Sequence, residues 1–189
     1  AVREYTERPE AKPGRAEGTF IVDEVLARAR YTAYVPKDYD PRRPWPLILA
    51  LHRDQDRSEN DFFNWETIAN SERYLLLFPA APNEGTWKFD DLPLVLSALR
   101  HAIQTYNVDT NRVYLGGTGA GGLLAWAAAL RHPEHFAGLV IRTAPIDDVT
   151  QLYLPNALNL PVYQIASERG LFDFEAVAGI VHADAGIVL

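Results

Sequence analysis

The chain has 189 residues, a formal net charge of −7 at pH 7 and no cysteine. Its length suits one hydrophobic core. The negative charge argues against a general affinity for nucleic acid or anionic membrane, because Lys and Arg supply most of that binding. The absence of cysteine excludes disulfides, thiolate metal sites and a cysteine nucleophile. No apolar run approaches the roughly 20 residues that a membrane-spanning helix needs.

The first residues differ in character from the rest. Residues 1–17 are polar, charged and interrupted by two prolines, which predicts a loosely held N-terminal arm. Residues 18–189 are predicted to form a single domain, or a fragment of a longer chain. The sequence begins at Ala1 and contains no methionine, so we expect the native start to have been removed by signal cleavage, proteolysis or truncation. A secreted or periplasmic location is favoured.

From residue 18 onward, short apolar runs alternate with amphipathic segments, a pattern typical of α/β proteins. Strands are predicted at 19–25, 31–35, 46–52, 74–79, 112–116, 138–142 and 161–166. Helices are predicted at 59–72, 92–106, 121–132 and 172–184. This order predicts a mostly parallel central sheet with helices on both faces, and a ligand site beyond the carboxyl ends of the strands.

The stretch "VYLGGTGAGG", residues 113–122, joins a buried strand to a helix through a glycine cluster. Gly117, Gly119 and Gly122 satisfy G-x-G-x-x-G, which allows a dinucleotide-binding turn. Such a turn normally lies in the first β-α-β unit and needs an acidic residue at the end of the following strand. Here that strand ends in Arg142 and Thr143. The alternative is a hydrolase turn that carries a catalytic nucleophile at its apex.

The surrounding sequence favours that alternative. "RVYLGGTGAGGLLAWAAALRHPEHFAGLVIRTAP" resembles the nucleophile region of α/β-hydrolase-fold esterases of the polyhydroxybutyrate-depolymerase and feruloyl-esterase type. "YTAYVPKDYDPRRPWPLILALH" resembles the entry into their third strand, and "TYNVDTNRVYLGG" resembles the approach to the turn. The resemblance covers roughly residues 18–185. It implies an α/β-hydrolase fold that lacks the usual C-terminal strand and helix.

The resemblance also implies how the turn has changed. Gly117, Gly119 and Gly121 fill the three defined positions of the family's G-x-S-x-G motif, so Gly119 stands where the nucleophilic serine is expected. Thr118 and Ala120 fill the intervening positions. We expect the Thr118 hydroxyl to bond nearby backbone rather than to replace the nucleophile.

Three further parts of the family's machinery depart from the pattern. His52 is followed by Arg53, where the resemblance implies the first glycine of an oxyanion loop. Gly170 stands where the triad acid is expected, and Asp147, Asp148 and Asp173 are interpreted as helix caps or solvated charges. No histidine follows the apolar C-terminus, and His182 lies within the predicted last helix.

The remaining candidates have structural explanations. We expect His52 to be a hydrogen-bonded core residue and His101 to lie on the polar side of its helix. His132 and His135 lack an acidic partner at metal-motif spacing, so no metal site or cofactor is predicted. Trp65 and Trp87 follow strands towards the predicted ligand edge, which makes each a candidate binding residue with a core position as the alternative.

These departures predict a catalytically inactive, esterase-like domain with a binding, scaffold or accessory role. One alternative is a serine carboxylesterase with a mutated nucleophile and a missing C-terminal segment, and a second is a dinucleotide-binding protein. The apolar end at Ile187, Val188 and Leu189 predicts an exposed sheet edge that a protein partner or a second copy covers.

Overall fold

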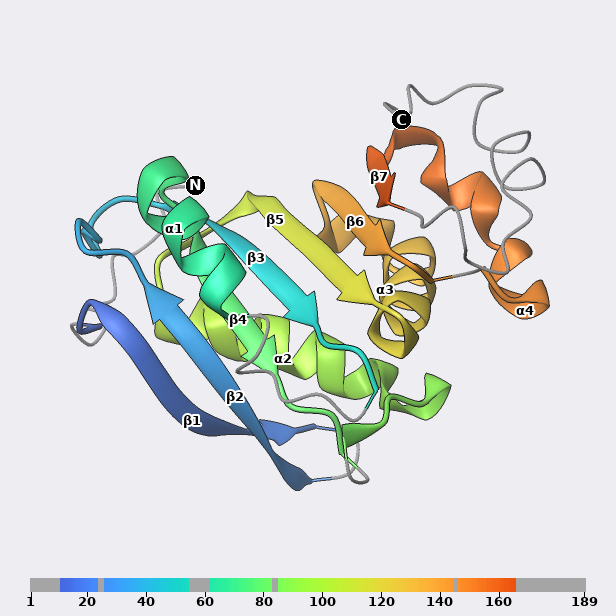
Figure 1. Cartoon of the computed structure of the whole chain (residues 1–189), viewed down its shortest axis with the longest axis horizontal. Coiled ribbons are helices and arrows are strands. Elements are labelled where there is room, and N and C mark those ends of the chain that lie inside the picture. Colours follow the sequence, from blue (N-terminus) through green and yellow to red (C-terminus); the bar gives the residue numbers. More distant parts are fainter. Residues whose placement is uncertain (1–10, 24–25, 55–61, 83–84, 145, 166–189) are drawn as a thin grey trace, which may run out of the picture.

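The computed structural model describes residues 11–165, apart from 24–25, 55–61, 83–84 and 145. These residues form one seven-stranded sheet with the strand order β1-β2-β4-β3-β5-β6-β7 (Figure 1). The strands are β1 (Gly14–Val22), β2 (Ala27–Val35), β3 (Trp45–Leu51), β4 (Leu75–Pro79), β5 (Val108–Thr118), β6 (Gly138–Arg142) and β7 (Val162–Ile165). The pairs β1–β2 and β2–β4 are antiparallel, and all other pairs are parallel. The predicted mostly parallel sheet is therefore confirmed.

Helices and short 3-10 turns connect these strands. The helices are α1 (Phe62–Glu72), α2 (Leu92–Thr105), α3 (Ala120–Arg131) and α4 (Asp148–Gln151). The 3-10 turns are η2 (Phe89–Asp91), η3 (Pro133–His135) and η4 (Leu154–Asn159). None of the described helices combines the length and the apolar character that a membrane crossing requires.

The structure differs from the sequence prediction at a few boundaries. β1 begins at Gly14, inside the segment 1–17 that was expected to be an arm, because residues 14–17 pair with the end of β2. β5 begins at Val108 rather than at residue 112, and Val108 pairs with Trp45 across an irregular register. The short helix α4 was not predicted. The predicted helix 172–184 lies outside the described residues.

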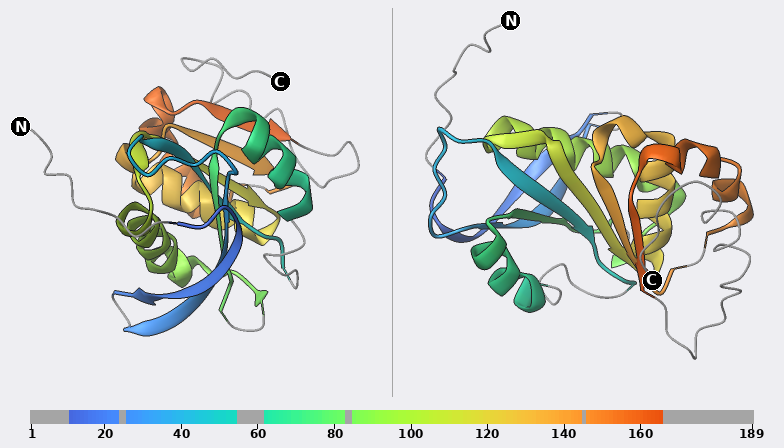
Figure 2. Two further views of the ribbon diagram at one scale, coloured as in Figure 1. Left: turned by 90° about the vertical axis from the view of Figure 1, so that its left-hand side faces the viewer. Right: turned by 90° about the horizontal axis from the view of Figure 1, so that it is seen from above.

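Alternation along the central strands divides the core between the two faces of the sheet. Leu47, Leu49 and Leu51 of β3 join the large apolar cluster that includes the buried residues of α2 and α3. The intervening Ile48 and Ala50 join a smaller cluster with Ala69 of α1. Figure 2 accordingly shows α1 on one side of the sheet and α2 and α3 on the other. The period of two within one nearly continuous apolar run therefore places helices on both faces.

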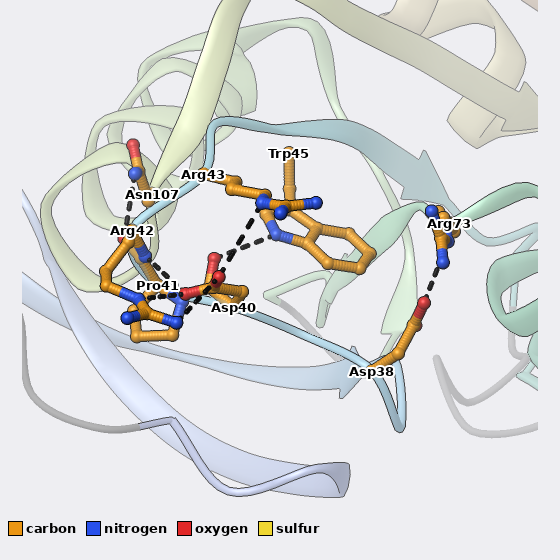
Figure 3. A network of polar contacts seen from close by, with 8 residues as sticks. All are labelled: Asp38, Asp40, Pro41, Arg42, Arg43, Trp45, Arg73 and Asn107. Carbon is orange, nitrogen blue, oxygen red and sulfur yellow. Dashed lines mark hydrogen bonds and ion pairs between the residues drawn. The ribbon is translucent and has the colours of Figure 1, made fainter.

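The loop before β3 is fastened by a polar network at the amino end of that strand (Figure 3). The indole N–H of Trp45 donates to the Asp40 carbonyl oxygen (3.0 Å), and the Asp40 carboxylate accepts from the side chain of Arg42 (3.0 Å). This bond is the main cause that lowers the pKa of Asp40. The side-chain amide of Asn107 donates to the Pro41 carbonyl oxygen (2.8 Å), which ties the loop to the start of β5. The network fixes the loop that enters β3 at the amino end of this strand, whereas the glycine turn lies at the carboxyl end of β5.

Candidate functional site

The glycine turn is a sharp strand-to-helix connection with an unusual backbone at its apex. β5 ends at Thr118, α3 begins at Ala120, and Gly119 between them has φ 56° and ψ −124°. The Gly119 N–H donates to the Arg142 carbonyl oxygen at the end of β6 (3.1 Å), and its own carbonyl oxygen accepts from Leu123 N–H (3.0 Å). L-residues rarely adopt this region of φ/ψ space. The apex therefore has the strained geometry of a nucleophile turn, although its residue is glycine.

Small residues on either side allow α3 to approach the sheet closely. A Cβ added to Gly117 would lie 2.4 Å from the Gly121 carbonyl oxygen. A Cβ on Gly121 would lie 2.3 Å from the His52 carbonyl oxygen, and one on Gly122 would lie 2.4 Å from the Ala144 Cβ. Each of these separations is too short for a real side chain. The three glycines flanking the apex are therefore required by packing.

Position 119 differs from its neighbours because it has room. A Cβ there would meet the Arg53 Cβ at 3.5 Å, which is an ordinary van der Waals contact. A serine at this position would fit the available space and would carry only the backbone strain of a positive φ. The turn thus keeps the shape that holds an apical side chain, while the hydroxyl itself is missing.

Thr118 does not substitute for that hydroxyl. It forms the last ladder pair of β5 with Arg142 of β6. Alternation along β5 places Thr118 on the face of the sheet opposite that of Leu115, which belongs to the α2 and α3 cluster. Ala120, the first residue of α3, lies at a helix N-terminus, where backbone N–H groups lack intrahelical acceptors. These are the donors from which an oxyanion hole is built.

His52 has a structural role, as predicted. It follows β3, is 2% exposed and uses both ring nitrogens. Nε2 accepts from Ala81 N–H (3.1 Å), so the proton is on Nδ1, which donates to the Arg53 carbonyl oxygen (2.7 Å). A ring held through both nitrogens joins the ends of β3 and β4. Arg53 is exposed beside the apex.

The two tryptophan candidates are buried to different extents. Trp87 is 5% exposed, and its indole N–H donates to the His52 carbonyl oxygen (2.9 Å). It therefore occupies a core position and links its own segment to the end of β3, while its candidacy as a binding residue stays a prediction. Trp65 of α1 is half-buried and packs on the small cluster that includes Leu76 and Phe78. The alternative of a core position holds for both residues.

Of the acidic residues in the described region, Asp147 acts as a helix cap, and Asp148 and Asp91 lie beside the starts of α4 and α2 without capping them. Asp147 precedes α4 and accepts from the N–H groups of Val149 (3.0 Å) and Thr150 (2.9 Å) and from the Thr150 hydroxyl (2.7 Å). Burial raises the pKa of its carboxyl, but these bonds outweigh burial and hold the pKa below its ordinary value. Asp148 is exposed in the first turn of α4. Asp91 precedes α2 but bonds back to the Lys88 N–H (2.7 Å) rather than to the helix.

Other sequence candidates are not brought to the turn. His101 of α2 stacks on Phe20 (5.8 Å between centroids), lies tilted against Tyr31 (4.9 Å), and has its pKa lowered by burial. It is half-buried, because these two aromatic side chains of the β1–β2 hairpin cover it. Three candidates, Gly170, Asp173 and His182, lie outside the described residues.

Comparison with known proteins identifies this architecture. The family model for the prolyl oligopeptidase family matches residues 80–170. A bifunctional acetylxylan esterase/xylanase of Neocallimastix patriciarum is 34% identical over 101 residues, which are 50% of this chain and 15% of that protein. Feruloyl esterase B of Neurospora crassa is 26% identical over 121 residues, which are 57% of this chain and 41% of that protein. The chain therefore spans less than half the length of either curated relative.

Solved structures decide the fold. A thermostable esterase superposes with a TM-score of 0.77 at 21% identity, covering 92% of this chain and 53% of that one. The chain is an α/β-hydrolase-fold domain. A ferulic acid esterase superposes with a TM-score of 0.72 at 13% identity, covering 94% of this chain and 89% of the other. The predicted resemblance to α/β-hydrolase-fold esterases is thus confirmed.

In this α/β-hydrolase-fold domain, the described part of the site provides a strained turn, helix N-terminal donors and a braced β3 end. It provides no hydroxyl at the apex of the turn. The positions of these groups depend on the close packing of Gly117, Gly121 and Gly122, which the sequence alone showed only as a glycine motif. Sequence reasoning did not show that His52, Trp87 and Gly121 meet at one carbonyl group, since they come from three distant segments.

Proposed function

We propose that this α/β-hydrolase-fold domain is catalytically inactive and has a binding or accessory role. The observation that carries the proposal is Gly119 at the apex of the turn, where the esterase mechanism needs a nucleophile. Without an apical hydroxyl, no acyl-enzyme forms, and the remaining donors give only weak acceleration of ester hydrolysis. Arg53 beside the apex supports the proposal, because its side chain borders the space that an acyl group would enter.

Covalent labelling tests the inactive state directly. The untreated chain is expected to show no labelling by a fluorophosphonate probe and no burst of product from an activated ester. Mass spectrometry of the labelled mixture would locate any adduct. An adduct at stoichiometric yield on any residue would overturn the proposal.

The alternative of an esterase with a mutated nucleophile is tested by Gly119→Ser. The apex has room for this side chain, so the variant is expected to fold with modest strain. We expect it to remain without turnover, because Arg53 replaces the expected loop glycine and Gly170 the expected acid. Gly119→Ala is the matched control for the strain. Turnover by the serine variant above that of the alanine variant would favour the esterase alternative.

The dinucleotide alternative receives less support from the packing of the turn. Gly122, the last glycine of the G-x-G-x-x-G match, packs against Ala144, and the closest approach involves Gly121, which that motif does not specify. We expect no change in melting temperature with NAD or NADP. A saturable increase that Gly119→Ser abolishes would support nucleotide binding.

We place the binding role at the β7 edge, with a second copy of the chain as the partner. β7 is the last strand of the described sheet, and two of its side chains, Tyr163 and Ile165, are apolar and exposed. Such edges tend to pair or to be covered. The C-terminal residues Ile187, Val188 and Leu189, on which the sequence prediction depended, lie outside the described residues.

Sedimentation velocity tests this association. Ile165→Asp is expected to shift the chain from dimer to monomer. Ile68→Asp is the matched control, because Ile68 on α1 is 42% exposed and Ile165 is 41% exposed. A monomer at all concentrations for the unmodified chain would contradict the role of the β7 edge, without bearing on the inactive state.

A further inference from the structure

The turn that follows α3 gathers three potential metal ligands on a short, well-defined backbone. His132 ends α3, and its N–H donates to the Ala128 carbonyl oxygen (3.0 Å). Pro133 then begins η3, in which His135 N–H donates to the His132 carbonyl oxygen (3.1 Å). A proline at the first position fixes one backbone dihedral. The side chains of His132, Glu134 and His135 therefore extend from a constrained turn.

These three side chains converge without forming good hydrogen bonds with one another. The Glu134 carboxylate oxygen lies 3.6 Å from His132 Nδ1 and 3.7 Å from His135 Nε2. All three potential ligand atoms lie within 4.8 Å of one another. Separations of this size are too long for direct hydrogen bonds. The carboxylate oxygen thus lies near both imidazoles without a hydrogen bond to either, and the two rings are stacked with their centroids 6.1 Å apart.

The separations are close to those of ligands around a tetrahedral metal ion. With zinc–nitrogen and zinc–oxygen bonds of about 2.0–2.2 Å, adjacent ligand atoms lie roughly 3.3–3.6 Å apart. The two distances to Glu134 are 3.6 and 3.7 Å, and all three ligand atoms lie within 4.8 Å of one another, so coordination of one ion would require side-chain rotation. A purely ionic explanation is weaker, because exposed pairs of this kind contribute little stability and require protonated imidazoles.

The neighbouring positive charge is held elsewhere. The Arg131 guanidinium lies over the Phe89 ring (4.2 Å to the centroid) and is also near the Tyr153 ring (4.8 Å). These contacts connect the last turn of α3 to η2 and η4. The Arg131 guanidinium therefore already has aromatic partners, which favours binding of another cation by the Glu134 carboxylate.

We propose that His132, Glu134 and His135 bind a divalent transition-metal ion of the zinc class, with water completing the coordination. Two imidazoles and one carboxylate suit Zn²⁺, Ni²⁺ or Cu²⁺, whereas Mg²⁺ and Ca²⁺ prefer oxygen ligands alone. The site lies near the amino ends of the parallel strands, whereas Gly119 lies at their carboxyl ends, because α3 runs back from those carboxyl ends. A bound ion would link the end of α3 to the turn that leads into β6, independently of chemistry at the glycine turn.

Titration calorimetry of the untagged chain with ZnCl₂ tests the proposal. We expect one saturable site, an increase in melting temperature with Zn²⁺ and neither effect with MgCl₂. Loss of one metal ligand should weaken binding by at least about tenfold, since even outer-shell changes cost that much. His132→Ala, His135→Ala and Glu134→Gln should each show that loss, and the double histidine variant should show no binding.

His182→Ala is the matched control, since it removes a histidine from another part of the chain and should leave the Zn²⁺ affinity unchanged. Co²⁺ offers a second readout, because a tetrahedral site gives strong visible absorption that an octahedral surface ion does not. That absorption should appear with the unmodified chain and disappear in the double histidine variant. Absence of Zn²⁺ binding, or binding that the double variant retains, would overturn the proposal.

Discussion

The centre of the sheet and its β7 edge are built on different principles. At the centre, β3 and β5 lie between other strands, and their Leu49 and Leu115 are fully buried against the helices. At the edge, β7 pairs with β6, and its Tyr163 and Ile165 are 47% and 41% exposed. Both regions are parallel sheet with apolar side chains. Position in the sheet, rather than the apolar character of the strand, therefore decides how deeply a side chain is buried.

The same contrast appears between the two faces of the sheet. On the side of α2 and α3, buried residues continue from β1 to β7 without interruption. On the side of α1, the smaller cluster involves β2, β3 and β4. Within the described ranges, α1 packs on that face at β2 and β4, while Tyr114 of β5 and Val140 of β6 are half-buried there. The core is therefore larger on the side of α2 and α3 than on the side of α1.

The largest expected effect compares one core side chain with one edge side chain. Leu115→Ala removes a fully buried side chain of β5 and leaves a cavity, so the free energy of unfolding should fall by about 2–5 kcal/mol. Ile165→Ala on β7 should change it by less than about 0.5 kcal/mol. Urea denaturation monitored by tryptophan fluorescence measures both values. Equal losses would mean that β7 is as tightly packed as β5.

A second comparison lies within the glycine turn. Gly121→Ala places a Cβ 2.3 Å from the His52 carbonyl oxygen, and a backbone atom has little freedom to move away. We expect a loss of about 3 kcal/mol in the free energy of unfolding. Gly119→Ala meets only an ordinary contact at 3.5 Å and carries the strain of its positive φ, which costs about 1–2 kcal/mol. The same denaturation experiment ranks the two variants, and the reverse order would contradict packing as the reason for Gly121.

The sequence predicted the elements of the centre well. The apolar run of β3, the helical period of α2 and the glycine cluster each carry a local signal that packing reinforces. The limits of β6 were predicted at residues 138–142, as the structure has them. β1 begins earlier than expected because residues 14–17 pair with the end of β2, and β5 begins earlier because Val108 pairs with Trp45. Such pairing is not visible in local sequence.

The candidate site was only partly predictable. The position of Gly119 at the apex followed from the motif, and the cap at Asp147 followed from residue type. The core position of Trp87 was one of its two predicted alternatives, but its bond to the His52 carbonyl oxygen, which spans 35 positions of the chain, is not visible in local sequence. The sequence prediction of no metal site considered standard motif spacing, and it stays a prediction. The 3-10 turn η3 brings Glu134 to 3.6 Å from His132 Nδ1 and 3.7 Å from His135 Nε2, an arrangement that helical spacing does not describe.

The smallest expected change in stability concerns the cap of α4 and depends on pH. Asp147→Ala removes three hydrogen bonds at the start of α4 and should lower the free energy of unfolding by about 1 kcal/mol at pH 7. Because the folded state lowers the pKa of Asp147, this stabilisation is present above the unfolded-state pKa and is lost as pH falls through the folded-state value. The difference between the variant and the unmodified chain should therefore shrink below about pH 4.

Asp148→Ala is the control, since this neighbour is exposed and should change stability by less than about 0.5 kcal/mol at either pH. Denaturation at pH 7 and pH 3 measures both variants, and a difference for Asp147→Ala that stays constant between these two values would show that its carboxylate charge does not contribute to the cap.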